Sequence, residues 1–140
     1  MKAVIDTNIF ISGIHWSGAS EKILIEWFDN KFDLISSEEI IQEIAKTLFN
    51  FKKYMPIEDI IHWISIIESK AIIIVPKVSF NAVKTDPDNN KFIDTAVEGD
   101  ADYIVSQDND LLDIKEFHGI KIISPIDFIK ELERNQSVTF

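Results

Sequence analysis

Apolar residues follow two alternating patterns along the chain, short continuous runs and longer segments with a helical repeat. Short apolar runs rich in β-branched residues favour buried strands. We expect five such strands, at residues 3–5, 32–35, 71–75, 102–106 and 120–124.

The longer segments have an apolar residue at every third or fourth position, which predicts helices. These helices are expected over residues 19–30, 36–51, 56–69, 89–99 and 125–134, with a short helical segment inside 109–117. Ser36 and Glu39 have the spacing of a capping box at the start of the second helix. The stretch DTNIFISG after the first run is assigned to no element.

Apolar strands separated by helices indicate an α/β fold with three α/β/α layers and a mostly parallel five-stranded sheet. A chain of 140 residues that is 46% hydrophobic suits one domain with one core, expected over residues 1–135, with a flexible C-terminal tail over 136–140. The longest apolar run is AIIIVP, too short to span a membrane, and the first residues do not resemble a signal peptide. We therefore expect a cytoplasmic protein without a membrane partner.

The formal net charge is −10, from 24 acidic and 14 basic residues. Proteins that bind nucleic acids usually carry a basic surface, so the total charge argues against such a partner. The excess is local, however, because residues 86–113 contain nine acidic residues and one lysine, and the rest of the chain is nearly neutral. A bound cation can invert the field of such a patch, so the charge does not exclude a polyanionic substrate.

Two acidic residues follow predicted strands. Asp6 comes directly after residues 3–5, and Asp108 lies two residues past 102–106. Ligands of parallel sheets bind outside the carboxyl ends of the strands. If these two strands are neighbours, the two carboxylates can therefore converge.

Other polar side chains can reach the same edge. Glu43 lies about two turns into the helix that follows the second strand, and Asp88 precedes the helix over 89–99. Asn90 and Asp94 are four positions apart and so share one face of that helix. Taken singly, each of these acids also suits a helix cap, a turn or a solvated surface.

Carboxylates that converge in a cleft must either be protonated or bind a cation. The chain has no cysteine, and none of its three histidines lies beside these acids, so the site would offer only oxygen ligands. Such ligands favour Mg²⁺ or Mn²⁺ (or Ca²⁺) over zinc. Two ions of this kind can stabilise both the attacking and the leaving oxygen in phosphodiester hydrolysis.

Over essentially its whole length the chain resembles the PIN domain family of metal-dependent ribonucleases, which includes the toxins of toxin–antitoxin pairs. VIDTNIFIS resembles the first family motif, SSEEIIQEIAKTL the second, and DPDNNKFIDTAVEGDADYIVSQDNDLL the third and fourth. The resemblance implies an endoribonuclease that uses Mg²⁺ or Mn²⁺ to cleave RNA. It also implies a homodimer and a small antitoxin as partner.

The resemblance places Asp6, Glu43 and Asp108 among the catalytic metal ligands. Position 89 is Asn where the most similar branch of the family has Asp, so the third acid falls on Asp94 or Asp88, with Asp86 ranked behind both. Asp94 is preferred because it shares a helical face with Asn90. Supporting roles are expected for Thr7, Asn8, Asn90, Ser106 and Asp110. Lys46 and Lys91 are expected to contact phosphates of the substrate.

Other functions fit less well. A response-regulator phosphoacceptor needs an Asp at the end of a middle strand, and residues 71–75 are followed by Pro76 instead. A haloacid-dehalogenase-type phosphatase needs Asp-x-Asp, and here the tripeptide is Asp6-Thr7-Asn8. A catalytically degenerate PIN-like scaffold that binds nucleic acid or protein is favoured only by the asparagines at positions 89 and 90.

Two groups of apolar residues exceed what one core requires. The helix over 56–69 carries Trp63 and Ile66 in addition to its buried stripe, so it is either buried on two sides or part of a dimer or antitoxin interface. His15 and Trp16 either line a groove near Asp6 on which bases stack or pack at its rim.

Overall fold

The computed structural model, which describes residues 1–137, contains one six-stranded sheet of order β3-β2-β1-β4-β6-β5. Its strands are β1 (Lys2–Ile5), β2 (Asp33–Ser36), β3 (Ile72–Ile73), β4 (Tyr103–Val105), β5 (Glu116–Phe117) and β6 (Ile120–Ile123). All neighbours pair in parallel except β5 and β6, which are antiparallel. The predicted mostly parallel sheet is confirmed, with β5 as an additional strand.

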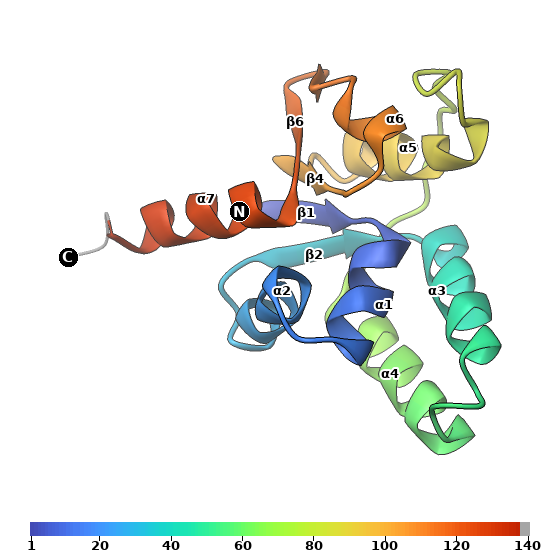
Figure 1. Ribbon diagram of the computed structural model, residues 1–140. Coiled ribbons are helices and arrows are strands. Elements are labelled where there is room, and N and C mark those ends of the chain that lie inside the picture. Colours follow the sequence, from blue (N-terminus) through green and yellow to red (C-terminus); the bar gives the residue numbers. More distant parts are fainter. Residues whose placement is uncertain (138–140) are drawn as a thin grey trace.

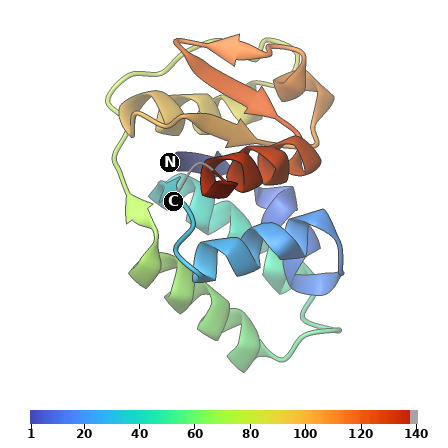
Figure 2. The ribbon, with the colours of Figure 1, turned by 90° about the vertical axis from the view of Figure 1, so that its left-hand side faces the viewer.

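Helices cover both faces of the sheet, which confirms the three-layer arrangement (Figures 1 and 2). On one side lie α1 (Thr7–His15), α2 (Ala19–Phe28), α3 (Glu38–Asn50) and α4 (Ile57–Lys70), with α7 (Pro125–Ser137) packed against α2. On the other side α5 (Asn90–Glu98) packs over β1, β2 and β4, after the 3₁₀ turn η1 (Pro87–Asn89), and α6 (Asn109–Leu112) follows β4. No helix within residues 1–137 is long and apolar enough to cross a membrane.

Helix α1 is the largest element that the hydrophobic pattern did not predict. Ile9, Phe10 and Ile11 are consecutive and all buried, because α1 packs against both α2 and α3. The less buried residues Asn8, Ser12 and His15 share one face of α1, but the three consecutive apolar residues interrupt the repeat by which the other helices are predicted. Asp6 caps α1, since its Oδ1 accepts a hydrogen bond from the Asn8 N–H at 3.2 Å. The first candidate ligand therefore also starts the first helix.

Three smaller boundaries differ from the prediction. Ser36 ends β2, and Ser37 is the N-cap of α3, with its Oγ accepting from the Ile40 N–H. Of the strand expected over 71–75, only Ile72–Ile73 pairs, at the edge of the sheet. The tail expected over 136–140 overlaps the end of α7, and residues 138–140 lie outside the described part of the chain.

Strand β5 is too short to produce a pattern. It joins β6 through a tight turn in which His118 (φ 52°) and Gly119 (φ 82°) both have positive φ. Two such residues in succession match the twist of an antiparallel hairpin. The turn geometry therefore determines the pairing of β5 with β6, whereas burial of apolar residues determines the strands of the parallel sheet.

Residues 74–86 carry the chain from β3 to α5 without regular secondary structure. Three side chains of α5, each four positions from the next, accept backbone N–H groups of this segment at 2.8 or 2.9 Å: Asn90 from Val83, Asp94 from Phe80, and Glu98 from Lys77. The shared face of Asn90 and Asp94 that the spacing predicts is present, and it holds this segment against the helix.

We expect Gly13→Ala to destabilise the fold by about 1–3 kcal/mol, because α1 and α2 would have to move apart. A Cβ at Gly13 would lie 2.8 Å from both Leu24 Cδ1 and the carbonyl oxygen of Ser20. Helix propensity alone predicts the opposite sign, a gain of about 1 kcal/mol for alanine over glycine. The measurement is urea unfolding followed by circular dichroism, with Ser12→Ala as control on the same helix. A stabilised Gly13→Ala variant would contradict the close packing of the two helices.

Candidate metal centre

The pairing of β1 with β4 brings together the ends of two strands that carry candidate ligands. Ile5 lies beside Val105 in parallel register, so the next residues, Asp6 and Ser106, leave the sheet at the same edge. From β1 the sheet extends through β2 and β3 on one side and through β4 and β6 on the other. Crevices at such switch points are the usual ligand sites of open parallel sheets.

Asp6 is almost completely buried, with 4% of its surface exposed. Its Oδ2 accepts a hydrogen bond from the Ser106 hydroxyl at 2.7 Å. Burial raises the pKa of the Asp6 carboxyl above its ordinary value although this bond and the Asn8 N–H lower it, and the nearby charges of Asp108 and Glu43 raise it further. The fold thus holds a carboxylate where ionisation is unfavourable without a cation.

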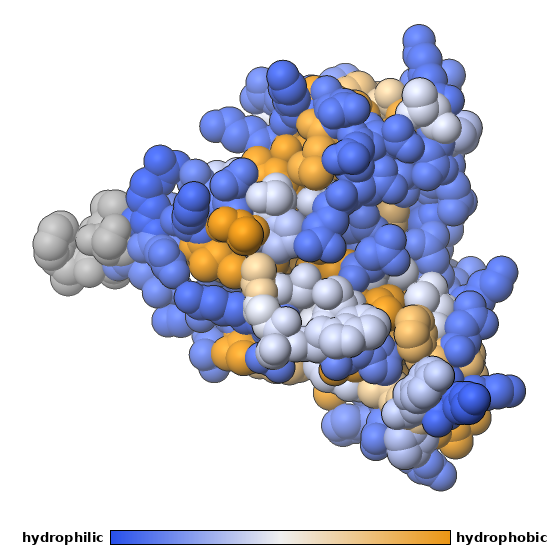
Figure 3. Space-filling view, viewed as in Figure 1, coloured by the Kyte–Doolittle hydropathy of each residue, from blue (hydrophilic) through white to orange (hydrophobic). Residues whose placement is uncertain are grey.

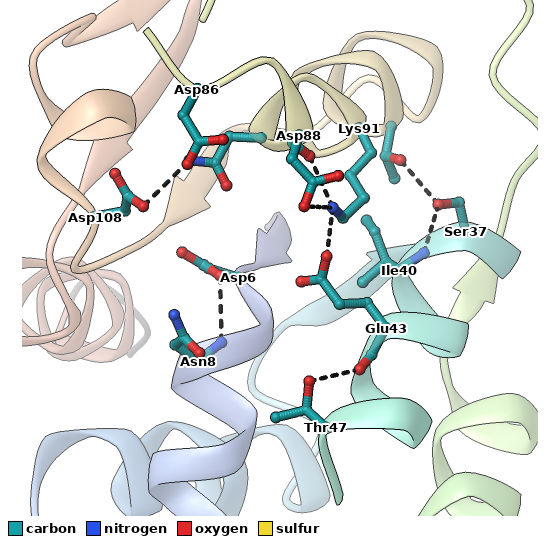
Figure 4. A network of polar contacts seen from close by, with 12 residues as sticks. Asp6, Asn8, Ser37, Ile40, Glu43, Thr47, Asp86, Asp88, Lys91 and Asp108 are labelled. Atoms are coloured by element: carbon teal, nitrogen blue, oxygen red, sulfur yellow. Dashed lines mark hydrogen bonds and ion pairs between the residues drawn. The ribbon is translucent and has the colours of Figure 1, made fainter. Parts of the chain in front are cut away.

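Ser106 fixes the relative position of two candidate ligands. Its buried Oγ donates to Asp6 and accepts a hydrogen bond from the Asp108 N–H at 2.9 Å. Asp108 in turn caps α6, because its Oδ1 accepts from the Asp110 N–H at 2.8 Å. Figure 4 shows Asp6 and Asp108 facing the same space, together with Glu43 from α3.

The segment before α5 adds a further carboxylate to this edge. One carboxylate oxygen from each of Asp86, Asp108 and Asp110 lies within 4.8 Å of the others, close enough for one metal ion. Asn89 donates its side-chain amide to Asp86 at 3.2 Å and to Asp108 at 3.1 Å. Asp86 ranks behind Asp88 and Asp94 in the prediction from the sequence, and the structure brings it beside Asp108.

Lys91 lies inside the site and pairs with Glu43. Its side chain is 5% exposed, and its ammonium group contacts the Glu43 carboxylate. The same group donates to the Asp88 carbonyl oxygen at 2.7 Å and lies 3.4 Å from the Asp88 carboxylate. Three acceptors match the three N–H donors of an ammonium group. We expected Lys91 to hold a substrate phosphate, but in the structure it neutralises Glu43.

The environment of Lys91 keeps this ammonium group charged. Burial by itself lowers the pKa of Lys91, but the hydrogen bond and charge of Glu43, together with Asp88, outweigh burial and raise the pKa above its ordinary value. Glu43 is therefore held in place by a cation that belongs to the protein itself.

The structure does not bring Asp94 to Asp6 and Asp108. Its Oδ1 accepts the Phe80 N–H, and Asp94 lines a cavity of about 280 Å³ that Asn90, Asp88 and Lys91 also line. Burial raises the pKa of Asp94, and the hydrogen bond from Phe80 lowers it. Asn90 likewise binds the backbone of Val83, so both side chains hold residues 74–86 in place.

The remaining candidates lie around the centre. The Asp88 carboxylate is 82% exposed, and Lys46 lines a groove of about 290 Å³ with Glu43, Asp88 and Lys91. Thr7 is buried, and its Oγ1 has no hydrogen-bond partner among the described residues. Asn8 is exposed and contributes its backbone N–H to Asp6.

Similarity to known proteins agrees with this arrangement. The PIN domain family matches residues 2–110, which include every acidic residue of the centre. The uncharacterized protein MJ1680 of Methanocaldococcus jannaschii is 36% identical over 146 aligned residues, covering 96% of this chain and 93% of that protein.

The same fold occurs in the crystal structure of VapBC2 from Rickettsia felis bound to a DNA fragment from their promoter. The TM-score is 0.60 at 14% sequence identity, and the match covers 89% of this chain and 98% of that one. With a family match that spans most of the sequence and the expected strand-end acids at one edge of the sheet, this chain belongs to the PIN domain family.

Proposed function

We propose that this protein is a nuclease that uses Mg²⁺ or Mn²⁺ to hydrolyse phosphodiester bonds within RNA. The observation that carries the proposal is the gathering of carboxylates at the switch point of the sheet, where Asp86, Asp108 and Asp110 lie close enough for one ion and Ser106 links Asp6 to Asp108. PIN domains are generally nucleases, which supports the reaction class. The choice of RNA as substrate rests on the resemblance to the ribonucleases of the family.

In this proposal Asp6 and Asp108 are the main metal ligands, with Asp86 and Asp110 completing the set. All four offer oxygen, and the chain has no cysteine, so the donor set fits Mg²⁺ or Mn²⁺ better than zinc. Asp94 is left out because its Oδ1 already accepts the Phe80 N–H. Glu43 borders the site, where Lys91 holds it.

A bound divalent ion of this kind lowers the pKa of a coordinated water and so supplies a nucleophile near neutral pH. The side chains of the protein provide the geometry. Ser106 fixes Asp6 relative to Asp108, and the Asn89 amide holds Asp86 beside Asp108. No side-chain nucleophile is required for such a reaction.

We further infer that the protein is the toxin of a toxin–antitoxin pair, acting in the cytoplasm as a homodimer that binds a small antitoxin. Support comes from the resemblance to PIN toxins and from apolar side chains outside the core. Ile57 and Ile61 on α4 and Ile72 and Ile73 on β3 are each more than 40% exposed. Light scattering of the purified chain tests the dimer, and arrested growth on expression tests the toxin.

A second function, a scaffold that binds RNA without cleaving it, is favoured by two contacts. Asn89 takes the position of an acid in the most similar branch of the family, and its amide occupies oxygens of Asp86 and Asp108. Lys91 neutralises Glu43 without any metal. Both features reduce the negative charge available to a cation.

The first test is cleavage of labelled single-stranded RNA in Mn²⁺. We expect cleavage that EDTA abolishes and that Asp6→Asn and Asp86→Asn each lower by more than about a hundredfold, since even indirect partners of a metal contribute about 10–100-fold. Asp94→Asn is the matched control, because its amide oxygen can still accept the Phe80 N–H, and its activity should stay close to that of the wild type.

Two outcomes of this test would change the proposal. If Asp94→Asn is inactive while Asp86→Asn cleaves normally, the third ligand is Asp94. If the wild-type protein neither cleaves RNA nor binds Mn²⁺, the scaffold function is favoured.

The second test separates stability from metal binding. Because burial makes the charge of Asp6 unfavourable, we expect Asp6→Asn to melt above the wild type in EDTA, since its amide oxygen can still accept the Asn8 N–H and its NH2 group can donate to Ser106 Oγ. Mg²⁺ at one hundred times its dissociation constant should stabilise the wild type by about 2.7 kcal/mol and leave the variant unchanged. Differential scanning fluorimetry measures both. A wild type that does not respond to Mg²⁺ would count against the metal centre.

The third test concerns the ion pair of Lys91. Removing one partner of a buried pair costs about 3–5 kcal/mol. The Glu43 side chain is 31% exposed, so water screens part of the lost interaction, and we expect Lys91→Met to lose less, about 1–3 kcal/mol.

The double variant Lys91→Met/Glu43→Gln should recover part of this loss, because no unpaired charge remains. Lys46→Met is the control, a change of an exposed lysine in the same groove. Urea unfolding gives all four free energies. Equal losses in the single and double variants would show that Lys91 contributes through packing alone.

A further inference from the structure

A pocket of about 400 Å³ lies where α1 ends and the chain leaves α3, lined by His15, Trp16, Phe51 and Tyr54. We call it the aromatic pocket. Three of its rings contact one another, with centroids 4.9 Å apart for His15 and Phe51 and 6.4 Å apart for Trp16 and Phe51. They form a continuous aromatic wall made by two segments distant in sequence.

Two rings of the aromatic pocket are largely exposed to solvent, Trp16 at 57% and Tyr54 at 75%. Single exposed aromatic residues are ordinary, but a group of them around a concavity is typical of a binding surface. The Nε2 atom of His15 is buried and has no hydrogen-bond partner within the described part of the chain. Because this atom is buried, it lies behind the exposed rings and not on the surface of the pocket.

The charges around the aromatic pocket differ from those of the rest of the protein. Residues 47–56 contain Lys52 and Lys53 and no acid, with Glu58 and Asp59 following at the start of α4, and residues 7–20 contain no charged residue, in a chain of net charge −10. Both lysines are exposed. Protein interfaces are depleted in lysine, whereas sites for single-stranded nucleic acids combine aromatic stacking surfaces with basic residues. The composition therefore favours a polyanion with flat bases over an apolar protein surface.

The aromatic pocket and the metal centre lie at opposite ends of the same two helices. Helix α1 begins after Asp6 and ends at His15, and α3 leads from Glu43 to Phe51. At a rise of about 1.5 Å per residue, both helices separate the pocket from the acids by about 12–14 Å. Figure 3 shows apolar and near-neutral surface between hydrophilic side chains in the region of α1, α3 and α4. A short length of single strand can span this distance.

We propose that the aromatic pocket binds a base of single-stranded RNA a few nucleotides from the phosphate held at the metal centre. Trp16 and Tyr54 provide the stacking faces, and Lys52 and Lys53 contact the neighbouring phosphates. This inference rests on the proposed nuclease function, but base binding itself requires no metal. The two can therefore be tested separately.

The experiment measures binding of short fluorescein-labelled oligouridine and oligoadenosine by fluorescence anisotropy in EDTA, where no cleavage occurs. We expect Trp16→Ala and Tyr54→Ala each to weaken binding by about tenfold, because a base stacked on one aromatic ring is worth about 1–3 kcal/mol. The matched control is Phe49→Ala, which removes an exposed aromatic ring of α3 that does not line the pocket. Circular dichroism and thermal melting confirm that the variants fold.

The lysines supply a second readout. Lys52→Ala and Lys53→Ala should each reduce the slope of log affinity against log salt by about 0.7, the value for one phosphate contact on a single strand. Lys121→Ala, an exposed lysine on β6 away from the pocket, should leave the slope unchanged.

Each outcome decides between the possibilities. Equal affinities for Trp16→Ala, Tyr54→Ala and Phe49→Ala overturn the base site, even if the protein cleaves RNA in Mn²⁺. Weaker binding by the pocket variants supports the site, even if the wild type does not cleave. A changed oligomeric state of Trp16→Ala by light scattering, with unchanged RNA affinity, assigns the pocket to a protein interface instead.

Discussion

The candidate centre depends on the parallel pairing of β1 with β4. This pairing joins residues near the beginning of the chain to residues about one hundred positions later, and it places Ser106 where its hydroxyl reaches the buried Asp6 carboxylate. The acids that follow β4 and precede α5 are positioned relative to these two residues, whereas Lys91 holds Glu43. Asp108 is held by Ser106, Asp86 is held through Asn89, and α1 begins at Asp6 itself. A change in this register would displace the site and the first helix together.

The fold accommodates its acidic segment mainly through backbone N–H groups. Asp94 and Glu98 accept N–H groups of the segment before α5, Asp108 accepts one from Asp110, and Asp102 accepts the Lys2 N–H at 2.9 Å. Hydrogen bonds from backbone amides stabilise the ionised form of a carboxylate without needing a lysine nearby. These bonds stabilise four of the nine acidic residues in 86–113, whereas Asp88 lies beside the single lysine and Asp100 and Asp113 are exposed to solvent. Many of these acids hold the backbone in place, so the number of acidic residues in the segment is larger than the number of candidate metal ligands.

The sequence predicts what depends on local pattern and chain order. The parallel sheet and the position of Asp6 and Asp108 at its carboxyl edge follow from apolar runs and from the rule for strand ends. Helix α1 is not predicted because its consecutive apolar residues Ile9, Phe10 and Ile11 do not follow the spacing of the other helices. The low rank of Asp86 and the phosphate contact predicted for Lys91 both come from sequence position, whereas the contacts that these residues make in the structure join loops and helices and no spacing reveals them. For Asp94 the spacing correctly predicts that it shares a helical face with Asn90. That face packs against the segment at Phe80, which the spacing does not indicate.

The two ends of α1 and α3 differ in charge. At the sheet end of these helices lie Asp6, Glu43 and their neighbours, where a phosphate can approach only after a cation is bound. At the other end lie the aromatic pocket and exposed lysines, which need no cation. A single strand would therefore first bind by its bases and flanking phosphates, and a metal would then be required for a phosphate to reach the acids. Lys91 keeps Glu43 neutralised within this arrangement, so the acidic end remains folded before any metal binds.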